Sequence, residues 1–343
     1  MRQGWEDLAA RACGLSTRLL GGARLRALAR EGNLADLARA LGAPAQPARG
    51  EAVTAPSLDA VARARGAALL AILARRAGAR ARVLDIVFED EDRRSIGALL
   101  RGAAAGTPRA ARLAGVVATP ALPPRTLELL AAQPNAAGVA ARLAELGSPY
   151  GAALLPDAQR ERPNLFALER RLDAVFAARV AARARRGDHP LRRLVRLRLD
   201  VANAWTALVL AGGGSPADAG ERSALARESF VEGGRRLPRD RCAEAAGADG
   251  RAAAMDRLAP LFDRTPLGDA LRAHAPLATL DDAALRWALA VVRRDARREP
   301  LGTARVLAFV LRLRAELRDL RRLAWGLALG VPRDRLERAL VSP

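Results

Sequence analysis

The residues best suited to chemistry form a run of carboxylates in the segment FEDEDRR, residues 88–94. Its adjacent acidic side chains, from Glu89 to Asp92, offer the oxygen ligands that Mg²⁺ and Ca²⁺ prefer. The run lacks the glycine and the ligand spacing of a calcium loop. Acidic residues are also favoured in the first turn of a helix, where the helix dipole is positive. We therefore interpret the run as a solvated helix start and expect no metal ion there.

Other motifs of catalysis are missing from the sequence. His189 lies in GDHPLRR and His274 in LRAHAPL, and neither has a ligand residue at zinc-site spacing. The segment AGGGSP, residues 211–216, lacks the Lys-Ser/Thr of a phosphate loop and follows a helix pattern, so it is most simply a helix end and a turn. Neither Gly-x-Ser-x-Gly nor His-Glu-x-x-His occurs. We expect no catalytic residue, no cofactor and no metal, so function should reside in surfaces.

A different use of carboxylates recurs along the chain. An acidic residue is followed three positions later by an acid or an amide, then by an apolar helix pattern and a glycine. This spacing places both side chains on one face of a helix. One such pair is readily explained as a surface acid satisfied by neighbouring arginines, but its recurrence favours a role in helix packing or in a shared surface. The pairs are Glu89 with Asp92 in EDEDRRSIGALLRG (89–102), Asp200 with Asn203 in DVANAWTALVLAGG (200–213), and Glu316 with Asp319 in ELRDLRRLAWGLALG (316–330).

Another repeated element is a helix that ends near a turn of small residues. It occurs as LADLARALGAPA (34–45), VAARLAELGSPYGAAL (139–154) and MDRLAPLFDRTPLGDAL (255–271). Each of these precedes one of the acid pairs by a similar distance. The sequence therefore predicts three interlocked copies of one helical unit, residues 1–110, 111–225 and 226–343.

The elements that carry these groups are predicted to be helices throughout. Of the 343 residues, 50% are hydrophobic and only 3% are aromatic, so the core must consist of Leu, Ala and Val. Ala and Leu favour helix, and no stretch alternates apolar and polar residues as a strand does. Residues 57–78 predict a helix with Ser57 as N-cap and Gly78 at its end. The longest apolar runs, 66–74 and 201–214, are shorter than the roughly 18–20 residues needed to cross a bilayer.

The net charge of +20 raises the question of nucleic-acid binding, because clustered basic residues neutralise phosphates. All 57 basic residues are arginine, and Ala, Gly and Pro are abundant, which indicates a GC-rich coding bias that replaces Lys by Arg. The positive charge still attracts acidic partners and anionic membrane surfaces. We expect no direct nucleic-acid binding, and a basic helical nucleic-acid-binding or scaffold protein stays open as the alternative.

The end of the chain carries the most specific family likeness. The segment EPLGTARVLAFVLRLRAELRDLRRLAWGLALGVPRDRLERAL (299–340) resembles the closing helix of a family of central-stalk proteins in V/A-type rotary ATPases. This is the AC39 family, whose members are called C in bacterial and archaeal complexes and d in eukaryotic ones. Residues 10–41, the segments SPYGAAL and TPLGDAL, and the helix of Asp200 and Asn203 resemble the same family. Departures from its pattern are Asp319, where the family usually has Asn, and GAPA (42–45) in place of a Thr-Pro-Tyr turn.

The resemblance implies a non-catalytic funnel of three helical units around a pseudo-threefold axis. In the family, the funnel sits on the cytoplasmic face of the membrane ring of proteolipid (c/K) subunits and receives the end of a shaft made by the D and F subunits. It turns with the ring, couples ion transport to ATP turnover, and is peripheral to the membrane without spanning it. Arginines of the helix 312–322 and of its equivalent near 93–101 are then expected to line contact surfaces, with Arg101, Arg318 and Arg322 as candidates.

Overall fold

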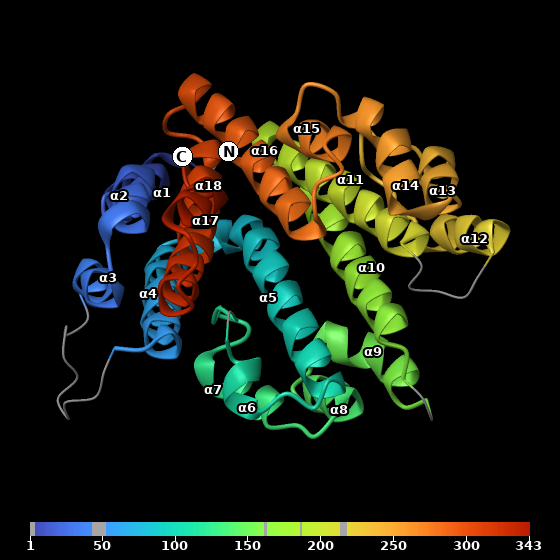
Figure 1. Cartoon of the computed structure of the whole chain (residues 1–343), viewed down its shortest axis with the longest axis horizontal. Coiled ribbons are helices and arrows are strands. Elements are labelled where there is room, and N and C mark those ends of the chain that lie inside the picture. Colours follow the sequence, from blue (N-terminus) through green and yellow to red (C-terminus); the bar gives the residue numbers. More distant parts are fainter. Residues whose placement is uncertain (1–3, 43–52, 115, 161–162, 186, 213–217) are drawn as a thin grey trace. The chain divides into compact units, whose positions relative to one another are not determined.

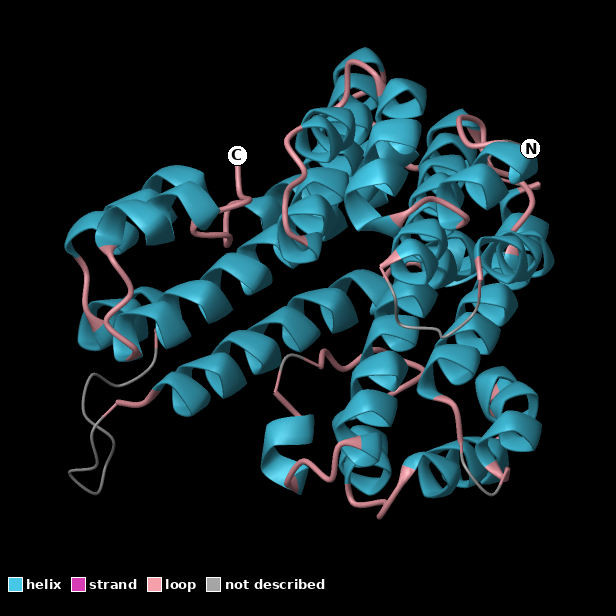
Figure 2. Ribbon diagram, turned by 45° about the vertical axis from the view of Figure 1, so that its right-hand side comes forward, coloured by secondary structure: helices cyan, strands magenta, loops and turns pink. Residues whose placement is uncertain are grey.

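The computed structural model describes residues 4–42, 53–114, 116–160, 163–185, 187–212 and 218–343. Every regular element within these ranges is a helix, as Figure 2 shows, so the all-α prediction is confirmed. The chain divides into two compact units, residues 1–165 together with 299–343, and residues 166–298. The first unit thus contains both ends of the chain, and the second is one continuous stretch.

The first unit combines long helices with shorter ones (Figure 1). The long helices are α4 (Ala55–Arg75), α5 (Ala81–Ala104) and α17 (Thr303–Ala328). Although α17 comes near the end of the chain, it packs along α4 and also contacts helices near the beginning. The shorter elements are α1 (Glu6–Ser16), α2 (Gly21–Glu31), α3 (Leu34–Leu41), η1 (Gly78–Arg80), α6 (Arg109–Arg112), α7 (Pro124–Ala131), α8 (Ala136–Glu145), α9 (Pro149–Ala158) and α18 (Arg333–Ala339).

A cluster of buried aliphatic side chains joins the two ends of the chain inside this unit. Leu25 of α2 and Leu37 of α3 are fully buried, and they belong to one cluster with Leu323 of α17 and Leu336 of α18. Full burial of a leucine contributes about 1.5–3 kcal/mol. Apolar contact is therefore the main force that holds α17 and α18 to α2, α3 and α4.

The start of α4 shows how local polar contacts set a helix boundary. The Thr54 hydroxyl accepts a hydrogen bond from the Ser57 backbone N–H, and the Ser57 hydroxyl accepts one from the Thr54 N–H, which is a capping box. The helix therefore begins at Ala55, and the prediction of Ser57 as N-cap is wrong because Ser57 is the reciprocal partner in the box. At the other end α4 stops at Arg75, and Gly78 has a left-handed φ of 54°.

The second unit is arranged around α11 (His189–Ala211), which contacts α12, α13, α14 and α16. Its side chains Leu194, Ala204 and Leu208 are buried. The helix ends at Ala211, as AGGGSP predicts, whereas residues 213–216 of that segment and residues 43–45 of GAPA lie outside the described residues. The other elements are α10 (Leu165–Ala184), α12 (Ala219–Ser229), α13 (Arg239–Ala246), α14 (Gly250–Leu258), η2 (Ala259–Phe262), α15 (Pro266–Arg272) and α16 (Leu277–Arg298).

The segments SPYGAAL and TPLGDAL are alike because each packs the start of a helix closely on its neighbour. Both begin a helix with a capping hydroxyl followed by proline. A Cβ added at Gly151 of α9 would lie 2.1 Å from the backbone nitrogen of Ala144 on α8. A Cβ added at Gly268 of α15 would lie 2.2 Å from the carbonyl oxygen of Phe262. Only glycine permits so close an approach to another backbone.

Candidate functional site

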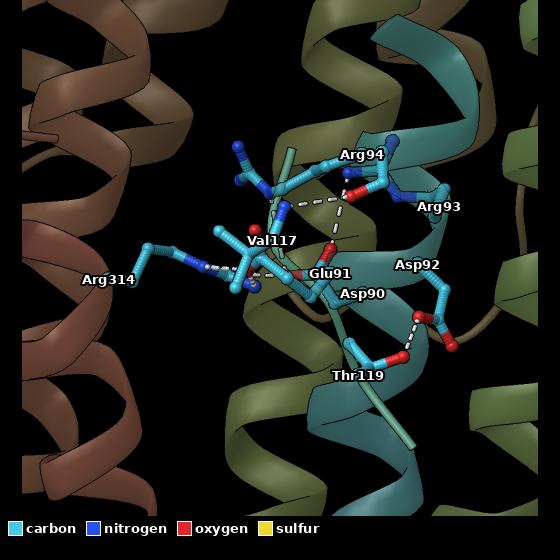
Figure 3. Close-up of polar contacts among 9 residues, drawn as sticks. Asp90, Glu91, Asp92, Arg93, Arg94, Val117, Thr119 and Arg314 are labelled. Carbon is cyan, nitrogen blue, oxygen red and sulfur yellow. Dashed lines mark hydrogen bonds and ion pairs between the residues drawn. The ribbon is translucent and has the colours of Figure 1, made fainter. Parts of the chain in front are cut away.

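The first acid pair lies on α5 and holds the segment that returns to this helix after α6. Asp92 is 3% exposed, and its Oδ1 accepts a hydrogen bond from the Thr119 hydroxyl (Figure 3). One turn further along α5, the Ser95 hydroxyl accepts a hydrogen bond from the Val117 N–H at 3.4 Å. Glu89, one turn before Asp92, is also buried. Two hydrogen bonds thus hold residues 116–119 against α5.

The second pair lies on α11 and holds the segment that follows α12. The Asn203 side chain donates to the Val231 carbonyl and accepts from the Val231 N–H, both at 2.9 Å. The buried Asp200 carboxylate accepts hydrogen bonds from the backbone N–H groups of residues 235–237, at 2.9–3.1 Å. Residues 231–237 are thereby fixed to α11 just before α13 begins.

The third pair lies on α17 and holds the segment that follows α18. Asp319 is fully buried and accepts hydrogen bonds from the backbone N–H groups of Val341 at 2.8 Å and Ser342 at 2.7 Å. Glu316 accepts a hydrogen bond from the Gly21 N–H at 3.2 Å, where α2 begins. The segment after α18 and the start of α2 therefore meet at this acid pair.

These pairs share one geometry. The second member of each pair binds a segment that lies 27, 28 or 22–23 residues further along the chain, and a short helix lies in between. All six side chains of the pairs are buried. The interpretation of a single pair as a surface acid satisfied by arginines is therefore wrong. Asp200 and Asn203 lie in the second unit, and the other two pairs lie in the first.

Burial shifts the proton equilibria of these acids. Burial raises the pKa of Asp200, Glu316 and Asp319, and hydrogen bonds from backbone N–H groups offset part of that rise. Burial raises the pKa of Asp92 to about 7, because the Thr119 hydroxyl lowers it only in part and nearby carboxylates raise it further. Asp92 therefore takes up or releases its proton near neutral pH.

A buried ion cluster joins α5 to α17 (Figure 3). Arg314 is 8% exposed, and its guanidinium donates to Asp90 Oδ2 at 2.6 Å and to Glu91 Oε2 at 2.7 and 3.0 Å. Asp90 also lies 3.2 Å from Arg93 and 3.8 Å from Arg94, on its own helix. Burial opposes the charge of Arg314, but attraction to the two carboxylates exceeds that effect and leaves its pKa raised.

This cluster corrects the interpretation of FEDEDRR as a solvated helix start. The run lies inside α5, which begins at Ala81, and the side chains of Glu89, Asp90 and Asp92 are buried. Arg314, which pairs with Asp90 and Glu91 of the run, lies 223–224 positions away in sequence. Removing one partner of such a buried ion pair typically costs about 3–5 kcal/mol, because the remaining charge stays buried without compensation. The cluster thus links α17 to α5 through a specific side-chain contact.

The candidate contact arginines lie in different surroundings. Arg101 is exposed in the last turns of α5, whereas Arg318 is half-buried on α17. Arg322 is half-buried too, and its guanidinium donates to the Ala339 carbonyl at 2.6 Å. Arg322 therefore supports the packing of α18, so a substitution there perturbs the fold as well as any contact surface.

A histidine contact and the potential metal-ligand residues are further polar features of the described ranges. His274 binds Asp256 at 2.7 Å, and both side chains are exposed. No group of three or more His, Cys, Asp or Glu residues in the described ranges is arranged to hold a metal ion. Each helix within those ranges is too short or too polar to traverse a lipid bilayer.

Fold and contacts define an all-helical protein whose buried acids hold segments of its own backbone. The chain belongs to the ATP synthase (C/AC39) subunit family, whose model matches residues 8–339. Similar relatives are the C subunits of the V-type ATP synthases from two strains of Thermus thermophilus. Each is 33% identical over 208 residues, which cover 60% of this chain and 59% of the relative. The matched segment therefore spans less than two thirds of these relatives.

Proposed function

We propose that this chain is a non-catalytic rotor protein in the central stalk of a V/A-type ATPase or ATP synthase. In this role it links the D and F subunits of the shaft to the membrane ring of proteolipid subunits and transmits torque for ion transport. The observation that carries the proposal is the family match over residues 8–339. The chain would then be peripheral to the membrane, at its cytoplasmic face.

The proposal includes a threefold internal repeat, with boundaries near residues 110 and 225, that forms a funnel. The shared geometry of the acid pairs supports it: Asp92, Asn203 and Asp319 each lie on a long helix and bind the segment that follows the next short helix. In the third copy that segment ends beside α2, which Glu316 binds. Gene triplication accounts for such an arrangement, because the exit of the last copy then meets the entrance of the first.

Torque transmission requires a body that resists deformation. Close-packed interiors have low compressibility and transmit strain, and the buried leucines that join α17 to α2 and α3 form such an interior. The ion cluster of Arg314, Asp90 and Glu91 adds a specific contact between α17 and α5. Both features favour a mechanical role for the first unit.

The half-buried face of α17 is our proposed contact surface for the shaft or the ring. Arg318 on it is half-buried, whereas Trp325 near the end of the helix and Leu329 just after it are 37% and 74% exposed. A surface that combines arginine with exposed apolar side chains suits an acidic amphipathic helix.

Co-purification tests this function. The chain is co-expressed with the D, F and proteolipid subunits of its own organism, and the complex is captured through a tag on the shaft. We expect recovery of the chain with the shaft and the ring, and loss of ATP-driven ion transport when the chain is left out. Failure of the wild-type chain to co-purify would refute the proposed function.

The contact surface is tested by charge reversal in the same assay. Arg318→Glu should reduce recovery, whereas Arg125→Glu, an exposed control on α7, should leave it unchanged. Circular dichroism melting of both variants checks that the fold is retained. Equal recovery of the two variants would exclude Arg318 from the contact surface without affecting the function itself.

A further inference from the structure

A cluster of exposed arginines lies in the second unit. It consists of Arg196 on α11 and Arg293, Arg294, Arg297 and Arg298 on the last turns of α16, and we call it the arginine patch. All its members are exposed. The ion pair between Arg193 of α11 and Asp295 of α16, at 2.9 Å, fixes these parts of the two helices side by side.

The described residues offer the patch no ion-pair partner. Asp295 lies between its arginines in sequence, but this carboxylate is 6% exposed and is bound by Arg193. Among the described residues, no carboxylate forms an ion pair with a member of the arginine patch. Elsewhere exposed arginines do have such partners, as Arg272 has Asp269 at 2.6 Å and Arg241 has Glu244 at 2.7 Å.

The spacing of the patch arginines brings like charges together. Arg293 and Arg297 are four residues apart on α16, as are Arg294 and Arg298, so each pair lies on one face of the helix. Like charges at this spacing destabilise a helix, and the helix dipole at the C-terminal end offsets that only in part. An arrangement that works against local stability without an internal partner indicates an external one.

The chemistry of the patch selects the kind of partner. Guanidinium groups bind phosphate oxygens in bidentate fashion and lie on long side chains that reach an interface. The nearby aromatic residue, Trp287, is buried and has Arg236 over its ring, so the helix offers no exposed ring there for stacking a nucleic-acid base. An extended anionic surface fits such a patch, because its lipid phosphates can engage several arginines together.

We propose that the arginine patch binds the headgroups of anionic phospholipids. The inference rests on the proposed function for placing the chain beside a membrane, and it adds a direct contact with lipid to the contacts with other proteins. Each arginine near an anionic leaflet strengthens binding by roughly fivefold. The patch therefore increases the affinity of the chain for the membrane without a membrane-spanning helix.

Vesicle flotation with the 343-residue chain tests this proposal. Vesicles of phosphatidylcholine alone are compared with vesicles in which one third of the lipid is phosphatidylglycerol. The patch variant carries Arg293→Gln, Arg294→Gln, Arg297→Gln and Arg298→Gln. A matched control variant loses the same charge at exposed positions on other helices, through Arg125→Gln, Arg241→Gln, Arg272→Gln and Arg338→Gln.

We expect the wild-type chain and the control variant to float with the anionic vesicles but not with phosphatidylcholine alone. Loss of the four α16 arginines, at roughly fivefold each, should weaken partitioning roughly 600-fold. Equal losses in both variants would overturn the proposal, because net charge alone would then explain binding. So would tight binding of duplex DNA that the patch variant alone loses, since the partner would then be nucleic acid.

Co-purification with the tagged shaft separates this proposal from the proposed function. A patch variant that still assembles but no longer floats supports a lipid contact. A patch variant that fails to assemble but floats like the wild type refutes it, because the patch would then contact protein. A wild-type chain that floats through its patch but never assembles would refute the proposed function and leave the lipid site standing.

Discussion

Replacing Asp92 by asparagine is expected to stabilise the first unit, and to do so more as the pH rises. Burial raises the pKa of Asp92 from 3.8 to about 7. The folded protein therefore binds this proton more tightly than the unfolded chain, and stability falls as the pH rises from about 4 to about 7. The difference between the two pKa values, roughly 3, corresponds to about 4 kcal/mol.

Asparagine avoids this loss, because its Oδ1 can still accept the Thr119 hydroxyl hydrogen and it carries no charge. Asn203 already occupies the corresponding place on α11 and binds a backbone segment through its amide. We expect Asp92→Asn to raise the free energy of unfolding by about 2–4 kcal/mol near pH 8, and by much less near pH 5.

Guanidinium unfolding at both pH values measures the effect. Trp5 and Trp325 lie in the first unit, so with Trp205 and Trp287 replaced by phenylalanine the remaining fluorescence reports on that unit. If Asp92→Asn stabilises the unit equally at both pH values, or makes it less stable near pH 8, the reasoning is refuted. Asp92 would then be ionised in the folded state without a cost in stability.

Asp90→Asn on the same helix is the contrasting control. This substitution removes the negative charge that lies 2.6 Å from the buried guanidinium of Arg314, so we expect it to destabilise the unit at neutral pH. Neighbouring carboxylates on one helix should thus respond with opposite signs.

The remaining predictions concern single contacts. Arg314→Met should lower the stability of the first unit by about 3–5 kcal/mol in guanidinium unfolding, and adding Asp90→Asn should recover part of the loss. Asp200→Ala leaves the backbone N–H groups of residues 235–237 without their carboxylate, so we expect a loss of about 2–4 kcal/mol and faster hydrogen exchange at those amides by mass spectrometry. Gly151→Ala should lower the melting temperature, because the added Cβ would lie 2.1 Å from the backbone of α8. Gly14→Ala inside α1 should raise it slightly, because a Cβ there meets nothing within 4 Å. Equal shifts would count against the close packing of α9 on α8.

Composition and local pattern were enough to predict the helices. Abundant Ala and Leu predicted an all-helical chain, and the described residues contain no other regular structure. The boundary at Thr54 was missed because either hydroxyl of its capping box, Thr54 or Ser57, makes a plausible N-cap in a sequence. The helix boundary depends on which of the two hydroxyl residues takes the N-cap position, and the sequence pattern alone does not distinguish them.

The acid pairs were found from their recurrence, but their partners were not. Asp200 and Asp319 bind backbone N–H groups, which every residue except proline carries, so no side chain marks those partners. Thr119 is the exception, since a hydroxyl beside Pro120 is a visible signal of a polar contact at a chain reversal. The role of FEDEDRR was mistaken because its cation, Arg314, is more than two hundred residues away.

Because residues 299–343 complete the body begun by residues 1–165, synthesis on the ribosome imposes an order on folding. The continuous stretch 166–298 can fold as soon as it emerges. The leucines of α2 and α3 remain without their partners until α17 and α18 have been synthesised, after residues 166–298. The nascent chain therefore carries an unfinished apolar surface through most of its translation, and a ribosome-bound chaperone that shields the first helices should increase its yield.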